Sequence, residues 1–567
     1  MLPFKISNKQ ESNQINNDMK PQNGVNDIRA FANQFRRTLK RIGRPMLSCF
    51  LCSVFLALAV WTVSGSQRSS GASERPTGAS ERPSGTCNIT PPPDAFQTTK
   101  QYVETFYPLW FTDNQAHPSD YNVLIGPERV SPLYHSVVMI NDDTVYCSAF
   151  LNLNPDDRRG GEPMAILTVP STGLPGCSDD FSVTYSILIL SPYGDVWPSP
   201  SPSPTPPSGI RHGAPPIPGG TYAFVGPDYT GMPTIPPGVT PIPVPWNYPT
   251  LIFRTDKYHS FASPTATPDY VNQINQAYCF RSSLQLQTLS EYNACQSGDQ
   301  AVVKPEFPDF SVPYKTIADA LVAEHPIDFL RDLRVAVHSH RTPSNTCAQE
   351  LSRQFDFLFG DGHWPDNSPF GHGAQAAHTE IVNNYVNGHQ IGANWTHFTN
   401  IGNWEPDNIT LSDAIDRSSI TEFCQFCNDI SSALYYHAFR DGAGQLLDGN
   451  NHYVLTFPAP TPPLQFNYPG PDTTRFWSLT AYTEQAIELV PNSINKYEVA
   501  SYSGARLNHD GSLSIHMAAE KPEGVPFENW LPVPKRHFNV VLRDYGPGDS
   551  VLPPNPAYTP PAIQLQP

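Results

Sequence analysis

The sequence predicts a mainly β fold of the sandwich or jelly-roll type, with a helical segment in its middle and one transmembrane helix near its start. Proline accounts for 62 of the 567 residues, and because proline cannot continue a helix, a mostly helical protein is excluded. The 30 Phe, 25 Tyr and 9 Trp residues supply large side chains for a core, which excludes global disorder. Short β-branched and aromatic segments recur between proline-marked turns, as they do in sandwiches and jelly rolls.

The start of the chain predicts a membrane anchor. Residues 1–45 carry nine Lys and Arg against three Asp and Glu, and residues 46–64 contain no charge. At 1.5 Å per residue the uncharged segment spans about 28 Å, close to the hydrocarbon thickness of a bilayer. The positive-inside rule keeps the basic head in the cytoplasm and places the bulk of this single-pass, type II chain on the luminal or extracellular side. A cleaved signal peptide is the alternative.

Several features after the anchor agree with a secretory location. Residues 65–93 include the repeat GASERPTGASERP, which predicts a flexible stalk. Residues 198–207 read PSPSPSPTPP, a stiff extended insertion that resembles the hydroxyproline-rich glycoproteins of plant and algal cell walls. Asn394 and Asn408 each begin an Asn-x-Thr sequon, so both are candidate glycosylation sites in a eukaryotic secretory pathway.

The net charge and the cysteine content limit the kinds of partner and the cellular location that the chain can have. The chain has a formal net charge of −17, which repels phosphate backbones and argues against nucleic-acid binding. Eight cysteines follow the uncharged segment, and an even number on the oxidising side of a membrane predicts disulfide bonds without fixing their pairing. In other proteins the spacing Cys-x-x-Cys is found in redox and zinc-binding motifs. The helical surroundings of Cys424 and Cys427 favour a structural role instead.

The rest of the chain divides into three regions. Residues 94–312 contain strand-like segments such as VYCSAFLNL and FSVTYSILIL and predict an N-terminal β domain that holds the Ser-Pro insertion. Residues 313–435 contain helical patterns such as PIDFLRDLRVAVHSH and predict a mixed helical connector. Residues 436–567 return to strands and predict a C-terminal β domain.

Motifs in both β regions resemble a known pair of families. VVMINDDTVYCSAFLNL, EPMAILTVPST and GGTYAFVGPDYTG are similar to the domain-of-unknown-function family numbered 1254. RFWSLTAYT, LVPNSINKY and LNHDGSLSI are similar to family 1214, which follows it in the chain. The resemblance implies two jelly-roll-like β-sandwich domains joined by a helical connector, often as a homo-oligomer, and the activity of these families is not established.

The motif N-x-D-T-x-Y supplies four candidate ligand-binding residues: Asn141, Asp143, Thr144 and Tyr146. Strand alternation would put Asn141 and Asp143 on one face and Thr144 and Tyr146 on the other. Asp143 is either an acid, base or ligand anchor in a pocket, or a turn device that bonds local backbone amides, and the second interpretation is favoured. Members of family 1254 commonly have an Arg two residues before the Asn, where this chain has Met139. A contact of that Arg with an anionic ligand would therefore be lost here.

A second group of candidates lies in the C-terminal region. Trp477, Tyr482 and Asn492, with Tyr497 beside them in the sequence, could line a platform that stacks on sugar rings. Packing in a strand core is the commoner fate of such residues.

The histidines give no metal pattern. Five of them crowd residues 360–398, a stretch that looks like an insertion, but no motif joins three or four ligands in fixed geometry. The sequence therefore predicts exposed loop histidines and neither a metal nor a cofactor. The five are His363, His372, His378, His389 and His397.

Two classes of function stay open. One is a carbohydrate-directed protein at the cell surface, either an enzyme or a binder, which agrees with the secretory location and the wall-glycoprotein-like tract. The other is a structural or assembly protein of jelly-roll domains without catalysis, because no recognisable catalytic set appears. Whether the chain is an enzyme is not decided by the sequence.

Overall fold

A computed structural model describes much of the chain from residue 94 onward. The described residues are 94–116, 121–127, 129–135, 137–158, 160–170, 185–197, 219–257, 270–295, 299–300, 302–303, 313–340, 346–402, 404, 411–461, 468–552 and 558–567. The expected head, anchor, stalk and Ser-Pro tract lie outside these ranges. Among the helices that the structure does describe, none has the length and apolar character needed to cross a bilayer.

The N-terminal β domain consists of two sheets that face each other. The strand orders are β11-β1-β2-β8-β4-β5 and β10-β9-β3-β6-β7. Side chains such as Cys147, Leu167 and Phe224 fill the space between the sheets. The elements are β1 (Ile125–Gly126), β2 (Thr144–Phe150), β3 (Ala165–Val169), β4 (Tyr185–Leu190), β5 (Val196–Trp197), β6 (Gly220–Val225), β7 (Thr240–Pro243), β8 (Thr250–Asp256), α3 (Tyr270–Ser282), β9 (Gln285–Thr288), α4 (Leu289–Asn293), β10 (Asp299–Gln300) and β11 (Val302–Val303).

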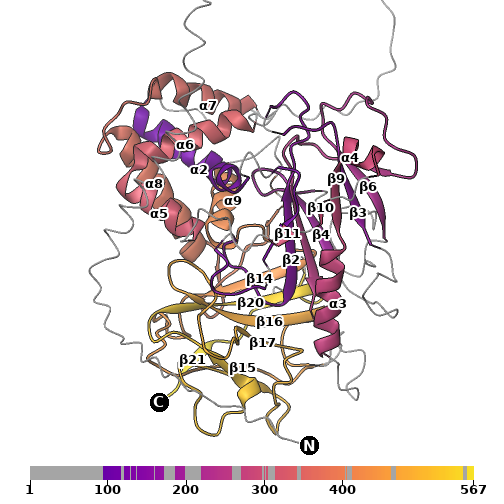
Figure 1. Cartoon of the computed structure of the whole chain (residues 1–567). Coiled ribbons are helices and arrows are strands. Elements are labelled where there is room, and N and C mark those ends of the chain that lie inside the picture. The colour runs from indigo at the N-terminus through magenta and orange to yellow at the C-terminus, as the bar shows by residue number, and fades with distance from the viewer. Residues whose placement is uncertain are drawn as a thin grey trace, which may run out of the picture. The chain divides into compact units, whose positions relative to one another are not determined.

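A group of helices forms the second part, and its longest member comes from an unexpected place. Helix α2 (Ala95–Gln115) falls in the range expected for the N-terminal β domain, but it packs against α6, α7, α8 and α9 (Figure 1). Asp94 caps its start, since the Asp94 carboxylate accepts from the Gln97 backbone N–H at 2.8 Å. The other helices are α5 (Tyr314–Glu324), α6 (Pro326–Ser339), α7 (Thr346–Phe359), α8 (Pro369–Asn383), the π-helical turn η1 (Asn384–Gly388) and α9 (Leu411–Cys424).

The C-terminal β domain also contains two sheets. Their strand orders are β12-β13-β14-β20-β16-β17 and β19-β18-β15-β21. Trp477, Tyr453 and Leu542 belong to the core between them. The elements are β12 (Gln390–Ile391), β13 (Trp395–Thr396), β14 (Ala433–Ala438), β15 (Tyr453–Phe457), β16 (Thr473–Thr483), β17 (Glu498–Ala500), β18 (Leu513–Ala518), the 3-10 turn η2 (Phe527–Asn529), β19 (Trp530–Pro532), β20 (Phe538–Pro547) and β21 (Ile563–Leu565).

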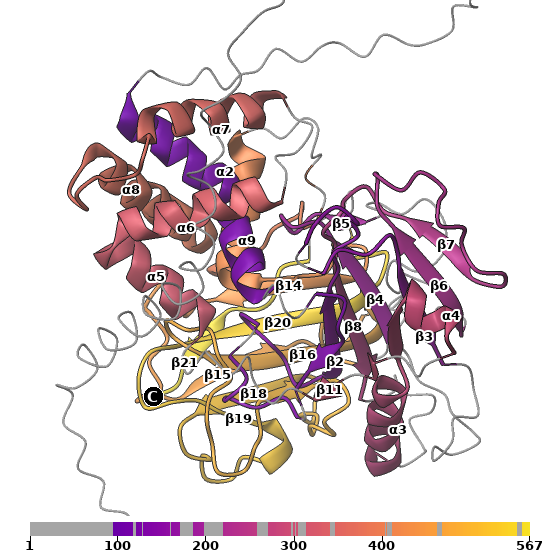
Figure 2. The ribbon, with the colours of Figure 1, turned by 45° about the horizontal axis from the view of Figure 1, so that its top comes forward.

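The two six-stranded sheets are buried on both faces, and this burial determines where the candidate functional site lies. One face of each sheet belongs to its own sandwich, while the other joins a shared core with the helices (Figure 2). Tyr146 and Ile252 enter this shared core from the first sheet, and Phe476 and Tyr545 enter it from the second. The expectation of a mainly β chain with several helices is confirmed. The pairs β1–β11, β6–β7 and β18–β19 are parallel, so the sheets are not wholly antiparallel.

Candidate functional site

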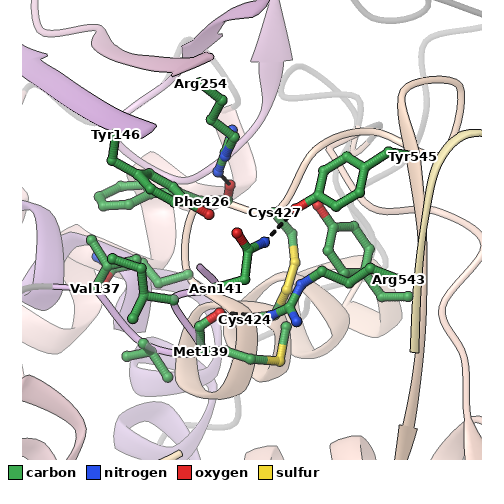
Figure 3. A pocket seen from close by; sticks show the side chains of 14 residues that line it. Val137, Met139, Asn141, Tyr146, Arg254, Cys424, Phe426, Cys427, Arg543 and Tyr545 are labelled. Atoms are coloured by element: carbon green, nitrogen blue, oxygen red, sulfur yellow. Dashed lines mark hydrogen bonds between the residues drawn. A yellow bond between two sulfur atoms is a disulfide. The ribbon is translucent and has the colours of Figure 1, made fainter. Parts of the chain in front are cut away.

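A pocket lies where the loop before β2 meets the end of α9 and the strands β14 and β20. Its unfilled volume is about 270 Å³, part of which is open to solvent. Figure 3 shows Asn141 in the middle of this pocket, with its amide pointing to Tyr545 and with Arg254, Tyr146 and Arg543 around it. Among the described residues that line it, the two arginines are the charged ones and no carboxylate is present.

Asn141 joins the two β domains inside the pocket. Its side-chain amide donates to the Tyr545 hydroxyl on β20, and its oxygen accepts from the Asp143 backbone N–H at 3.2 Å. The strand alternation expected for this motif does not apply here, because β2 begins only at Thr144 and residues 142 and 143 form a bend. Asn141 and Tyr146 therefore line the same pocket.

Asp143 is fully buried and is held by the C-terminal domain. Its two carboxylate oxygens accept from the Ser478 hydroxyl at 2.7 Å and from the Tyr502 hydroxyl at 2.5 Å. Burial raises the pKa of Asp143, while Arg543 and these two hydroxyl donors oppose the rise. The sequence favoured a local turn device, but both oxygens bond side chains of the other β domain. Asp143 is thus a contact between domains.

Arg543 lies beside this carboxylate and fixes the loop that forms the pocket wall. One terminal nitrogen donates to the Met139 carbonyl and to the Tyr482 hydroxyl, each at 2.7 Å. Tyr482 in turn donates to the Ile140 carbonyl at 2.8 Å. Met139 has a φ of 59°, a left-handed conformation that a non-glycine residue rarely adopts. The bonds from β16 and β20 hold it there.

Arg254 and Tyr146 form the opposite wall on neighbouring strands, where they are paired across β2 and β8. The Arg254 guanidinium lies 5.4 Å from the centre of the Tyr146 ring and donates to the Phe426 carbonyl at 2.6 Å and to Asn428 at 3.1 Å. The Tyr146 hydroxyl has no hydrogen-bond partner among the described residues. A free phenol beside a guanidinium is a ready donor for a ligand oxygen.

Further charged pairs line the seam outside the pocket. Lys257 contacts Asp142, and the Arg475 guanidinium donates to Asp256 at 3.1 Å. Burial raises the pKa of Asp256 to about 6 despite Arg475. Burial, followed by the nearby Asp142 and Asp143, also raises the pKa of Glu498 well above its usual value. The seam between the β domains thus concentrates titratable groups.

The remaining candidates do not gather in this pocket. Thr144 is buried at the start of β2, and its hydroxyl has no hydrogen-bond partner within the described part of the chain. Trp477 is fully buried in the C-terminal core and offers no exposed ring face. Asn492 closes its own turn by donating to the Val490 and Lys496 carbonyls. Tyr482 alone of this second group reaches the network around Asp143.

The sequence analysis did not identify the two basic residues of the pocket. Arg254 and Arg543 come from β8 and β20, two strands that are buried along their whole length. A charge inside an apolar strand is the signal that could have found them, because such a charge requires a partner when it is buried. Tyr435 and Tyr545 carried no comparable signal.

Two other predictions from the sequence can be compared with the structure near this region. The Asn394 amide donates to the Asp441 carbonyl at 2.7 Å, so a glycan there would have to attach through the other N–H of that amide, and Asn408 lies outside the described residues. The prediction of exposed loop histidines is wrong for two residues. His378 lies in α8, and His397 is buried and bonds the Tyr435 carbonyl at 2.9 Å. The later part of the stretch folds into α8, η1 and two strands, whereas His363 lies in an exposed loop before α8, as predicted.

Four of the six cysteines in the described part of the chain are oxidised, which agrees with the expectation of disulfide bonds. Cys424 and Cys427 form a disulfide beside the pocket, and Cys279 and Cys347 are also disulfide-bonded. Cys147 and Cys295 are free, the first buried and the second exposed.

Comparison with known proteins supports the family resemblance. Residues 121–278 match the family described as a protein of unknown function, DUF1254, and residues 432–549 match DUF1214, described in the same words. The N-terminal and C-terminal order is the one that the sequence motifs indicated. No curated protein matches the chain.

Two solved structures are similar to the chain. The VPA0106 protein from Vibrio parahaemolyticus shares 17% identity and a TM-score of 0.46, over 83% of this chain and 100% of its own. A putative uncharacterized protein from Burkholderia cenocepacia shares 12% identity and a TM-score of 0.34, over 83% of this chain and 93% of its own.

Proposed function

We propose that this chain, which carries a DUF1254 region followed by a DUF1214 region, binds a small anionic and hydroxyl-bearing molecule such as a sugar acid. The observation that supports this is the lining of the pocket between the two regions. It presents the guanidinium groups of Arg254 and Arg543 with no carboxylate among its described residues. An anion entering a largely buried site gains from both groups, since charges interact more strongly there than in water.

The other lining groups suit hydroxyl groups on the ligand. The free Tyr146 hydroxyl and the Asn141 amide can exchange hydrogen bonds with an alcohol, and the ring of Tyr435 supplies an apolar face. The unfilled volume of about 270 Å³ includes space open to solvent, and it is below the usual range for ligand sites, about 300–1,000 Å³. A single small molecule that enters with its acid group is therefore a better candidate than a chain of sugars.

Calorimetric titration of the chain with glucuronate and galacturonate, against glucose and galactose, tests the proposal. We expect saturable binding of the acids and none of the neutral sugars. Tyr146→Phe and Arg254→Met should each weaken binding at least tenfold, about 1.4 kcal/mol. Tyr146→Phe breaks no hydrogen bond between residues that the structure describes, so it separates binding from folding. Arg536→Met, at an exposed arginine outside the pocket, is the control.

Equal binding of neutral sugars, or no binding at all, would contradict the proposal. A stable multimer in light scattering with no ligand affinity would instead favour the structural or assembly role.

The membrane placement is a further part of the proposal and rests on the uncharged segment 46–64 and the basic residues before it. Sealed microsomes should protect the residues after 64 from added protease. Digestion of the β domains from the cytosolic side would refute this topology.

A further inference from the structure

A cluster of charged side chains lies among the helices, separate from the pocket between the β domains. Lys315 and Asp319 come from α5, His378 from α8 and Glu422 from α9. Tyr107 of α2 completes the cluster, and its hydroxyl donates to Glu422 at 2.6 Å. Glu422 is fully buried, in the same helix whose end carries the Cys424–Cys427 disulfide.

Lys315, Asp319 and His378 of this cluster line a groove over α5, α8 and η1, and the fully buried Glu422 lies beside Lys315 and His378. The groove has an unfilled volume of about 850 Å³, including space open to solvent. Beyond the charged residues its walls are polar as well as apolar, and they include Thr379, Asn383 and Asn387. The π-helical turn Asn384–Gly388 forms part of the wall, and such turns are frequent at functional sites.

Three side chains of the cluster converge as metal ligands do. The Nε2 atom of His378 lies 3.1 Å from Oδ1 of Asp319 and 3.7 Å from Oε1 of Glu422. The ligand atoms of the three residues all lie within 4.8 Å of one another. An ion bound at about 2.0–2.2 Å from each ligand would set neighbouring ligand atoms about 3.0–3.5 Å apart, close to the shorter of these separations.

Nε2 of His378 and Oδ1 of Asp319 lie 3.1 Å apart, which is ion-pair distance for a protonated imidazole. The pair is poorly aligned, since both atoms are buried and neither makes a well-oriented hydrogen bond within the described residues. Buried polar atoms held only by such a contact are incompletely satisfied. A metal ion at this position would contact both atoms at once.

We propose that Nε2 of His378, Oδ1 of Asp319 and Oε1 of Glu422 bind a divalent transition-metal ion such as Zn²⁺ or Mn²⁺. Imidazole nitrogen with carboxylate oxygen suits these ions. Three protein ligands leave at least one coordination position, which faces the groove, and this is the arrangement of metal sites that act on a bound molecule. Tyr107 orients Glu422 from behind, as outer hydrogen bonds do in such sites.

Lys315 is the competitor of the ion. Its ammonium contacts Glu422 and lies 2.9 Å from Asp319, so it already provides both carboxylates with a positive charge. The ion must therefore share Glu422 with the ammonium.

Equilibrium dialysis of the full chain tests the site. After treatment with a chelator, the chain in mild detergent is dialysed against ZnCl₂ or MnCl₂, and the bound metal is measured by elemental analysis. We expect one ion per chain. His378→Ala and Asp319→Asn should each weaken binding at least tenfold. His372→Ala, at an exposed histidine of the same helix, should leave it unchanged. Circular dichroism confirms that each variant is folded.

A second variant gives a result that a purely structural ion-pair cluster would not. Lys315→Met removes the competing charge, so it should tighten metal binding at least tenfold, because a cation a few ångströms from the ion repels it. Binding by the wild-type chain that is no tighter than by His378→Ala would overturn the proposal. Failure of a folded Lys315→Met variant to bind the ion more tightly would overturn it as well.

Discussion

The hydrogen bond from Tyr502 to Asp143 should carry a large share of the coupling between the two β domains. Its donor–acceptor distance is 2.5 Å, and the carboxylate is fully buried. Tyr502→Phe removes the hydroxyl and leaves one carboxylate oxygen without a partner. Buried hydrogen bonds to charged groups contribute about 1.5–3 kcal/mol, so we expect the free energy of unfolding to fall by about that amount.

Tyr497→Phe is the matched control. Tyr497 is also buried in this domain, but its hydroxyl donates to the neutral Asn495 side chain of its own turn at 3.1 Å instead of to a carboxylate. Its removal should cost about 0.5–1.5 kcal/mol. Urea denaturation measures both variants, with a check that the dependence on denaturant is unchanged. In an Asp143→Asn background the cost of Tyr502→Phe should fall below about 1 kcal/mol, as a double-mutant cycle reports.

The sign of the pH dependence follows from the same contacts. Burial raises the pKa of Asp143, and the Tyr502 hydroxyl opposes that rise. Without the hydroxyl the pKa rises further, so the deficit of Tyr502→Phe should be greatest where Asp143 is ionised and should shrink on acidification. The reasoning is refuted if Tyr502→Phe costs no more than the control, or costs the same in both backgrounds.

Two other predictions concern titratable groups that differ in burial. Burial, followed by Asp328 and Asp113, raises the pKa of Asp332 to about 7. Its folded pKa thus lies above the unfolded value, and its contribution to stability is present below about pH 4 and is lost as the pH rises through 7. Thermal melting should show that Asp332→Asn gains about 2–4 kcal/mol at pH 8 relative to pH 4, and an equal effect at both pH values would contradict this. Peptide mapping after alkylation should find Cys295 modified in the native chain and Cys147 only after unfolding, since burial raises the pKa of the Cys147 thiol to about 12.

The strands were predictable because local sequence determines them. Segments such as Tyr185–Leu190 consist largely of Ile, Leu and aromatic residues, and they are buried along their whole length. Helix α2 was not predicted, because it is rich in Tyr, Phe, Trp and Thr and contains Pro108 in its interior. The spacing of Tyr102, Phe106 and Trp110 is helical, and burial of that face against four other helices outweighs the weak intrinsic preference.

The site was half predictable for a related reason. The motif around Asp143 could be recognised along the chain, but its partners are 335 and 359 residues away in Ser478 and Tyr502. No local pattern encodes a contact over that separation. The metal ligands proposed among the helices, Asp319, His378 and Glu422, also come from three separate helices, so no spacing rule could join them.

The shared core gives a physical reason for finding the DUF1254 and DUF1214 regions in one chain. Separating them would expose a second apolar face on each six-stranded sheet, including Tyr146 on one and Phe476 and Tyr545 on the other. It would also leave Asp143 and Arg543 without the partners that each receives from the opposite region. A sheet buried on both faces gains stability only when both covering layers are present. Neither region is therefore complete alone, and the pocket at their seam exists only in the joined chain.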